Sequence, residues 1–107
     1  MAEDIVIKLT SDFFKTLAHP VRLNILRTLK DGERCVCEII DELDIEQSNL
    51  SQHLGLMKKQ GLLDSRKDGQ KVLYRIVYPS VLDVVTAAEK TLSEQISRSQ
   101  GLLKFLK

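Results

Sequence analysis

The sequence predicts a mainly α-helical domain with a two-stranded β hairpin, and three observations support this fold class. Apolar residues recur at helical spacing along most of the 107 residues. Residues 44–46 form a short turn between two amphipathic segments, as in a helix-turn-helix. Residues 63–67 and 71–76 then flank Asp68-Gly69, a dipeptide typical of hairpin turns. The sequence therefore predicts a winged helix-turn-helix.

Two helices are predicted in the N-terminal third of the chain. Phe13 and Leu17 belong to an apolar face with helical spacing over about residues 4–17. Pro20 interrupts that helix and suits the first position of the next one, because an N–H would be unpaired there anyway. Gly32 is expected just beyond the end of the second helix, where a left-handed backbone is common.

The predicted helix-turn-helix consists of a third helix at about residues 37–43 and a fourth at about residues 47–60. Leu50, Leu54 and Met57 of the fourth helix follow the i, i+4, i+7 spacing of a buried stripe. The opposite side of that helix is polar, so we expect it to face solvent or a partner.

A long closing helix is predicted over about residues 79–106. Apolar residues, including Val81, Val85 and Leu92, follow one side of it. A chain of this length builds only a modest core, so pairing with a second copy would supply further buried surface. We expect one domain that spans residues 1–107.

Charge is unevenly distributed, although the net charge is only +1. Between positions 33 and 46 there are six acidic residues, and Arg34 is the only basic one. From position 47 to position 78 the sign reverses, with Lys58, Lys59, Arg66, Lys67, Lys71 and Arg75. A local basic field attracts phosphate groups even in a nearly neutral protein.

The fourth helix and the hairpin form the predicted DNA-binding surface, within a winged motif at about residues 35–78. Short amide and hydroxyl side chains near a helix N-terminus suit base edges and phosphates in the major groove. A merely solvated polar surface is the alternative, but the adjoining basic hairpin favours double-stranded DNA. The predicted DNA-binding residues are Gln47, Ser48, Asn49, Ser51, Gln52, His53, Lys58, Arg66, Lys67, Gln70 and Lys71.

Five segments carry a family resemblance, and they read LAHPVRLNIL (17–26), CVCEI (35–39), QSNLSQHL (47–54), QGLL (60–63) and YRI (74–76). Together they resemble the ArsR/SmtB family of winged-helix repressors. The resemblance implies a homodimer paired through helices at about residues 4–17 and 79–106, with a DNA-binding core at about residues 20–78. It also implies a palindromic operator and a repressor that an effector, usually a metal or metalloid ion, releases from DNA.

One position departs from the family pattern at the start of the recognition helix. Glu46 stands where the family usually has Ser or Thr as the helix cap. Glutamate is a poorer N-cap, although its charge suits the helix dipole. We therefore do not count Glu46 among the DNA contacts.

Cys35 and Cys37 are the most informative chemical feature of the sequence. If the third helix begins at Cys37, the segment before it is extended, and residues two apart then point to the same side, with Val36 towards the core. Inside a regular helix the pair would lie on roughly opposite faces. Paired thiolates select soft ions such as arsenite, cadmium, lead or copper(I). We expect two thiols in a reducing cytoplasm rather than a structural disulfide.

The resemblance to the family's metal sensors is incomplete. Its arsenic sensors have a further cysteine three residues along, where this chain has Ile40, and its cadmium and lead sensors have N-terminal cysteines that this sequence lacks. Its zinc sensors use closing-helix histidines, and no histidine follows His53. A third donor would be water, a small thiol, Glu33, Glu38 or a group of the other subunit. Thiol-oxidation sensing and inert thiols therefore stay open beside soft-metal sensing.

Other function classes have less support. The sequence has no phosphate-cradling glycine loop and no Ser or Cys elbow with an identifiable base, so we expect no enzyme. No apolar stretch approaches the roughly 18 residues of a membrane span, and the first residues do not resemble a signal peptide, so we expect a cytoplasmic protein. His19 is expected at a helix junction. A protein-binding winged helix and a small dithiol redox or metal-carrier protein are the alternatives of another class.

Overall fold

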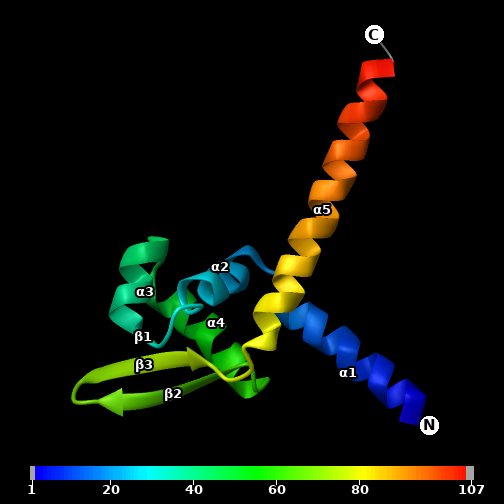
Figure 1. The fold of residues 1–107 in the computed structure, drawn as a ribbon. Helices are drawn as coiled ribbons and strands as arrows, with labels where there is room; N and C mark the ends of the chain where they lie inside the picture. Colours follow the sequence, from blue (N-terminus) through cyan, green and yellow to red (C-terminus); the bar gives the residue numbers. More distant parts are fainter. Residues whose placement is uncertain (1, 106–107) are drawn as a thin grey trace.

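The computed structural model describes residues 2–105, with side chains described as far as residue 101, and it has the predicted fold class (Figure 1). This part of the chain forms five helices and three strands. In chain order they are α1 (Ala2–Leu17), α2 (Pro20–Thr28), β1 (Arg34–Cys35), α3 (Val36–Leu43), α4 (Gln47–Lys59), β2 (Leu63–Asp68), β3 (Lys71–Ile76) and α5 (Ser80–Phe105). The mainly helical winged helix-turn-helix is therefore confirmed.

The core lies where α2, α3 and α4 meet. The apolar stripes predicted for these helices are buried there, and Ile25, Ile39 and Leu50 are each 0% exposed. Leu54 and Met57 continue the buried stripe of α4. Burying one such side chain stabilises a fold by roughly 1.5–3 kcal/mol relative to leaving it exposed. The three helices thus form a rigid support that presents the other face of α4 to solvent.

The hairpin forms at the predicted place. In the antiparallel pair of β2 and β3, Leu63 lies opposite Ile76, and Asp68 lies opposite Lys71. Gly69 in the turn has φ +64°, a left-handed value that glycine adopts without strain. The hairpin is therefore fixed at its tip by turn chemistry and at its base by the core.

A third strand, β1, extends the predicted two-stranded wing into a three-stranded sheet. Arg34 pairs with Tyr74 and Cys35 pairs with Leu73, which gives a sheet of order β1-β3-β2. Two residues are too few to show the alternating pattern by which a strand is recognised in a sequence. This strand, which the sequence did not predict, places the cysteine segment directly beside the wing.

α1 and α5 extend away from the core, on the side opposite to the hairpin tip (Figure 1). Large apolar side chains on both helices are exposed, namely Ile5, Val6, Ile7, Leu9 and Phe14 on α1, and Leu92 and Ile96 on α5. Residue 106 of the predicted closing helix lies outside the described residues. No helix within residues 2–105 combines the length and the apolar character needed to cross a membrane.

Candidate DNA-binding face and cysteine pair

The N-terminal half of α4 presents polar side chains to solvent. Leu50 and Leu54 fix the helix in the core. The predicted contact residues Gln47, Ser48, Asn49, Ser51 and Gln52 are all exposed. Glu46 occupies the N-cap position without a capping hydrogen bond from its side chain, and it accepts instead from the Ser48 hydroxyl at 2.6 Å. Glu46 therefore does not cap α4 with its side chain, in line with the expectation that glutamate is a poor N-cap. The backbone N–H groups at a helix N-terminus attract anions.

His53 is turned towards α2 instead of lying with these exposed residues. Its Nδ1 accepts a hydrogen bond from Arg22 Nε at 3.1 Å, and its ring centroid lies 4.4 Å from that of His19. His19 caps α2 at the predicted helix junction, where its Nδ1 accepts from the backbone N–H of Val21. Burial, and then His19 and Arg22, lower the pKa of His53. His53 thus joins α4 to the start of α2, a contact that the sequence did not predict, and its predicted contact with DNA stays a prediction.

The predicted basic contacts near the wing fall into two groups. The first group has intramolecular partners. Arg66 forms a bidentate ion pair with Glu33, in which Arg66 Nε donates to Glu33 Oε2 at 3.1 Å. Lys58 Nζ donates to Ser65 Oγ at 2.7 Å. Hydrogen bonding between Arg66 and Glu33 lowers the pKa of Glu33 and raises the pKa of Arg66. The second group is exposed, and no hydrogen bond or ion pair within the described residues holds its side chains: Lys67, Gln70 and Lys71.

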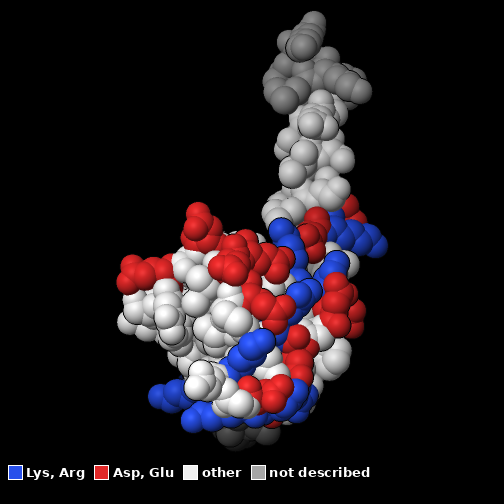
Figure 2. All heavy atoms as spheres, turned by 90° about the vertical axis from the view of Figure 1, so that its left-hand side faces the viewer, with Lys and Arg blue, Asp and Glu red and all other residues white. Residues whose placement is uncertain are grey.

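Acidic and basic side chains occupy different parts of one face. Figure 2 shows basic side chains along the lower edge, where the hairpin lies, and acidic side chains gathered at the upper left, on the side of α3. α3 and its flanking turns carry Glu38, Asp41, Glu42, Asp44 and Glu46. The lower edge at the wing is therefore rich in basic side chains, whereas acidic and basic side chains are mixed on the right of this face (Figure 2).

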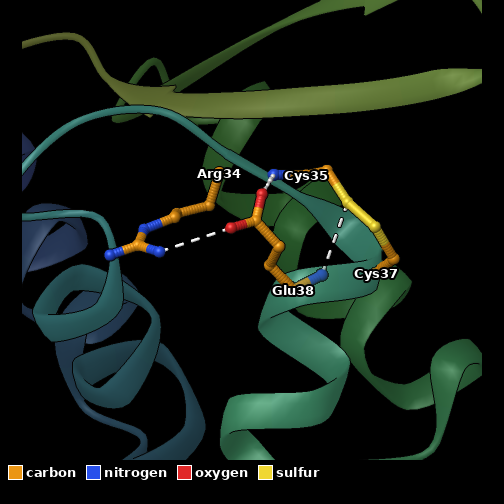
Figure 3. Close-up of a disulfide and its surroundings, with 4 residues drawn as sticks. All are labelled: Arg34, Cys35, Cys37 and Glu38. Carbon is orange, nitrogen blue, oxygen red and sulfur yellow. Dashed lines mark hydrogen bonds and ion pairs between the residues drawn. A yellow bond between two sulfur atoms is a disulfide. The ribbon is translucent and has the colours of Figure 1, made fainter.

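Cys35 begins α3 by capping it. Its backbone is extended, with φ −74° and ψ 153°, so the helix starts at Val36, one residue earlier than predicted. Its Sγ accepts from the backbone N–H of Glu38 at 3.4 Å, and the Glu38 carboxylate accepts from the backbone N–H of Cys35 at 3.1 Å (Figure 3). Arg34 donates to the same carboxylate at 3.3 Å. These hydrogen bonds, with that from Cys35 the most important, lower the pKa of Glu38.

Cys35 and Cys37 form a disulfide, where the sequence led us to expect two thiols (Figure 3). Extended Cys35 and helical Cys37 place their Cα atoms 5.3 Å apart, within the usual range for disulfides. The sulfur atoms therefore converge as predicted, although the cap is Cys35 and not Cys37. Cys35 is 2% exposed, whereas Cys37 is exposed. Within the described residues no group of three His, Cys, Asp or Glu side chains is placed to hold a metal ion.

A groove of about 410 Å³ connects the cysteine pair with the exposed face of α4. The start of α3, the N-terminal half of α4, and the hairpin turn with β3 form its sides. Its lining includes Cys35 and Cys37 together with Gln47, Ser51, Gln70 and Lys71. Sequence spacing could not predict this groove, because its sides come together only in the folded chain.

The winged helix-turn-helix, with an exposed polar recognition helix beside a basic hairpin, defines a DNA-binding transcriptional regulator. Residues 19–65 match the model of the family described as bacterial regulatory protein, arsR family. The HTH-type transcriptional regulator Rv0081 of Mycobacterium tuberculosis is 36% identical over 108 aligned residues, which cover 100% of this chain and 95% of that protein. The chain belongs to the ArsR family of transcriptional regulators, which are not enzymes.

Solved structures share the fold. The crystal structure of Rv0081 superposes with a TM-score of 0.79 at 38% identity, covering 87% of this chain and 94% of that one. The transcriptional repressor BigR from Xylella fastidiosa gives 0.74 at 31% identity, covering 85% and 95%. A homodimeric winged helix-turn-helix DNA-binding domain from Mycobacterium bovis, Mb0332, gives 0.77 at 26% identity, covering 90% and 89%.

Proposed function

We propose that this protein is a homodimeric, cytoplasmic repressor that binds a palindromic operator in double-stranded DNA through α4 and the wing. One observation carries the proposal. The exposed polar half of α4 and the exposed wing residues Gln70 and Lys71 line the same groove, so one DNA duplex can contact both. Amide and hydroxyl groups suit base edges, and lysines suit phosphates. The structural relative BigR is described as a repressor.

Dimerisation is inferred from the apolar surfaces of α1 and α5. Ile7 is 70% exposed and Leu9 62% exposed on α1, and Leu92 and Ile96 are 56% and 58% exposed on α5. A second copy would bury these side chains through the same surface on both subunits. The relative Mb0332 is described as homodimeric. Two copies would place two recognition helices against the two halves of a palindrome.

The DNA-binding proposal is tested by removing wing charges that form no hydrogen bond or ion pair within the described part of the fold. We choose Lys67→Gln/Lys71→Gln, because Lys58 and Arg66 have intramolecular partners whose loss would complicate the result. The matched control is Lys30→Gln/Lys90→Gln, which removes the same charge from exposed positions outside α4 and the wing. Duplexes selected from a random pool by the unmodified chain serve as operator.

Operator affinity of the wing variant should fall by at least about tenfold, and the slope of log K against log salt should become shallower by roughly one for each phosphate that the variant no longer neutralises. The control should bind like the unmodified chain. Equal binding by all three proteins, or selection of no sequence at all, would contradict operator binding and favour the protein-interaction alternative.

We further propose that the cysteine pair controls DNA affinity by binding a soft metal or metalloid ion, such as arsenite, cadmium, lead or copper(I), when it is reduced. The convergence of Cys35 and Cys37 supports this proposal, since both sulfur atoms could reach one ion. Glu38 is hydrogen-bonded to Cys35 and Arg34, and Glu33 is paired with Arg66. A third ligand is therefore best supplied by water, a small thiol or the other subunit.

Thiol oxidation is a second candidate for the same control point. The specific observation in its favour is the disulfide itself, because it shows that the backbone lets the two sulfur atoms bond. Oxidation would then take the place of ion binding as the signal. Both candidates use the same pair of residues, so one experiment can separate them.

The position of Cys35 offers a short route from this pair to DNA. Cys35 caps α3, which shares the hydrophobic core with the recognition helix, and it also pairs with Leu73 of the wing. A change at the sulfur atoms would therefore act on the recognition helix and on the wing together. The sequence predicted only the first of these connections, because it gave no sign of β1.

Operator binding is measured with the reduced chain in the presence of arsenite or cadmium, and with the oxidised chain in the absence of both. We expect the ions to weaken binding by the reduced chain, and the double variant Cys35→Ser/Cys37→Ser to lose the response. A response to oxidation alone would favour the redox candidate. An unchanged response to both ions in the double variant would rule out soft-metal control through these cysteines.

A further inference from the structure

The groove beside Cys37 is large enough for a small organic molecule. Its volume of about 410 Å³ falls within the roughly 300–1,000 Å³ of ligand pockets. Its lining includes residues of α4 and of the wing with polar side chains, namely Gln47, Ser51, Gln70 and Lys71. A molecule held there would lie between the two elements that we propose contact DNA.

The two sulfur atoms beside this groove differ in access. Cys35 is 2% exposed and its Sγ accepts a hydrogen bond from the N–H of Glu38, whereas Cys37 is exposed. An incoming thiolate can therefore approach Cys37, while Cys35 is shielded by the fold. In an exchange reaction the accessible sulfur is the one attacked and the other is the leaving group.

We propose that Cys37 is a site of reversible mixed-disulfide formation with a small, carboxylate-bearing thiol that then occupies this groove. The effect of the adduct on DNA rests on the proposed function, whereas its place of attachment does not. Neither a bound ion nor a simple Cys35–Cys37 disulfide would place a molecule in the groove between α4 and the wing.

The reaction is a thiol–disulfide exchange without net oxidation. The thiolate of the small molecule attacks Cys37 Sγ, the Cys35–Cys37 bond breaks, and Cys35 leaves as a thiolate. The backbone N–H of Glu38 already points at that Cys35 sulfur, and a helix N-terminus favours a thiolate. In reverse, the Cys35 thiolate attacks Cys37 and releases the small thiol.

The charge around the groove favours an anionic molecule. Lys71 lines the groove and has no hydrogen bond or ion pair within the described residues. The Glu38 carboxylate is turned towards Arg34, away from Cys37 (Figure 3). A carboxylate of the small thiol could therefore pair with Lys71, and its amide groups could bond with Gln47, Ser51 or Gln70.

Two single variants decide where the adduct forms. In Cys35→Ser the hydroxyl can still cap α3, because serine is a favoured N-cap residue, and Cys37 remains as the only thiol. Cys37→Ser leaves only the buried Cys35. Both full-length variants are treated with glutathione disulfide, and adducts are followed by intact mass and located by peptide mapping.

Cys35→Ser should gain one glutathione per subunit, and Cys37→Ser should react at least about tenfold more slowly, consistent with burial of its thiol. The adduct on Cys37 should weaken operator binding by at least about tenfold, and dithiothreitol should restore it. Equal reaction rates of the two variants, or an adduct that leaves operator affinity unchanged, would overturn the proposal. Failure of the untreated variants to bind operator would instead contradict the proposed function, and the reaction rates would still decide the site.

The anionic preference has its own test. In the Cys35→Ser background, Lys71→Gln is treated with glutathione disulfide and, separately, with the uncharged bis(2-hydroxyethyl) disulfide. Any change in the acidity of the Cys37 thiol alters both rates equally, so the ratio of the rates reports only recognition of the carboxylates. The ratio should fall by about two- to fivefold, the effect of one exposed charge pair. An unchanged ratio would show that Lys71 does not bind the small thiol.

Discussion

The hydrogen bond from Arg22 to His53, which joins α2 to the recognition helix, requires a neutral His53 imidazole. Nδ1 accepts the Arg22 hydrogen bond only when it is unprotonated, and a proton would add charge beside both Arg22 and His19. Burial and these neighbours lower the pKa of His53 from the ordinary 6.5. As pH falls, the unfolded chain therefore binds the proton first. The stability contributed by neutral His53 is complete above the ordinary value and is lost as pH drops through the lowered pKa.

We therefore expect acid to lower the melting temperature of the unmodified chain more steeply than that of His53→Gln, between about pH 7 and about pH 5. Glutamine keeps a polar side chain but binds no proton in this range. Thermal melts at constant ionic strength measure the effect. The lowered pKa values of Glu33 and Glu38 affect both proteins alike. Parallel pH profiles would contradict the role assigned to His53.

At the level of helices and strands, the buried stripe of α4 shows what the sequence can predict. Leu50, Leu54 and Met57 recur at helical spacing because the core needs one apolar face, so burial leaves a pattern in the sequence. The strand β1 leaves no such pattern in the sequence, since its two residues owe their conformation to pairing with β3. The pairing of Glu33 with Arg66, 33 residues later, and the packing of His53 on His19 also depend on the tertiary fold. The exposed polar residues of α4 were therefore predictable, but the intramolecular partners of Arg66 and His53 were not.

The start of α3 depends on a cysteine acting as a helix cap. In the reduced chain, Cys35→Ala should lower the free energy of unfolding by about 0.5–2 kcal/mol, because the N–H of Glu38 loses its acceptor. Cys35→Ser should be clearly more stable than Cys35→Ala, since a hydroxyl can still cap the helix. Urea unfolding in the presence of a reductant measures both. Cys37→Ala, at an exposed position, is the control and should change the free energy of unfolding little. Equal stabilities of Cys35→Ser and Cys35→Ala would contradict capping by residue 35.

The ion pair across the wing restrains a residue that was predicted to bind DNA. In Glu33→Gln the Arg66 side chain loses its charged partner and becomes available to a phosphate. Operator affinity should therefore rise by a few-fold, and the salt dependence should steepen by roughly one for each further phosphate that is neutralised. Both side chains are accessible to solvent, at 56% for Arg66 and 35% for Glu33, so the melting temperature should change little. Asp64→Asn, which releases Arg75 instead, is the matched control. A loss of affinity in Glu33→Gln would show that the pair orients the wing for DNA binding.

At the scale of the whole molecule, an isolated subunit is more extended than a compact chain of its length. Its radius of gyration is 17.3 Å, whereas a compact domain of this length has about 13 Å. The larger radius of gyration comes from α1 and α5, which extend from the core in different directions (Figure 1). Helices that project in this way while exposing apolar side chains are incompletely buried in the single subunit. A second copy that covers them would explain both the shape and the exposure.

Replacing Leu92 and Ile96 by glutamate should therefore convert the proposed dimer into a monomer, because two charges per subunit would have to be buried in the interface. Size-exclusion chromatography with light scattering measures the mass. Leu92 and Ile96 lie outside the core against which α4 packs, so the helical circular dichroism signal should be retained. The monomer should lose most of its operator affinity, since it places only one recognition helix on the palindrome, yet it should keep its affinity for a single half-site. The control Glu94→Gln changes an exposed residue on the same helix. A dimer that persists in the double variant would show that other surfaces join the two subunits.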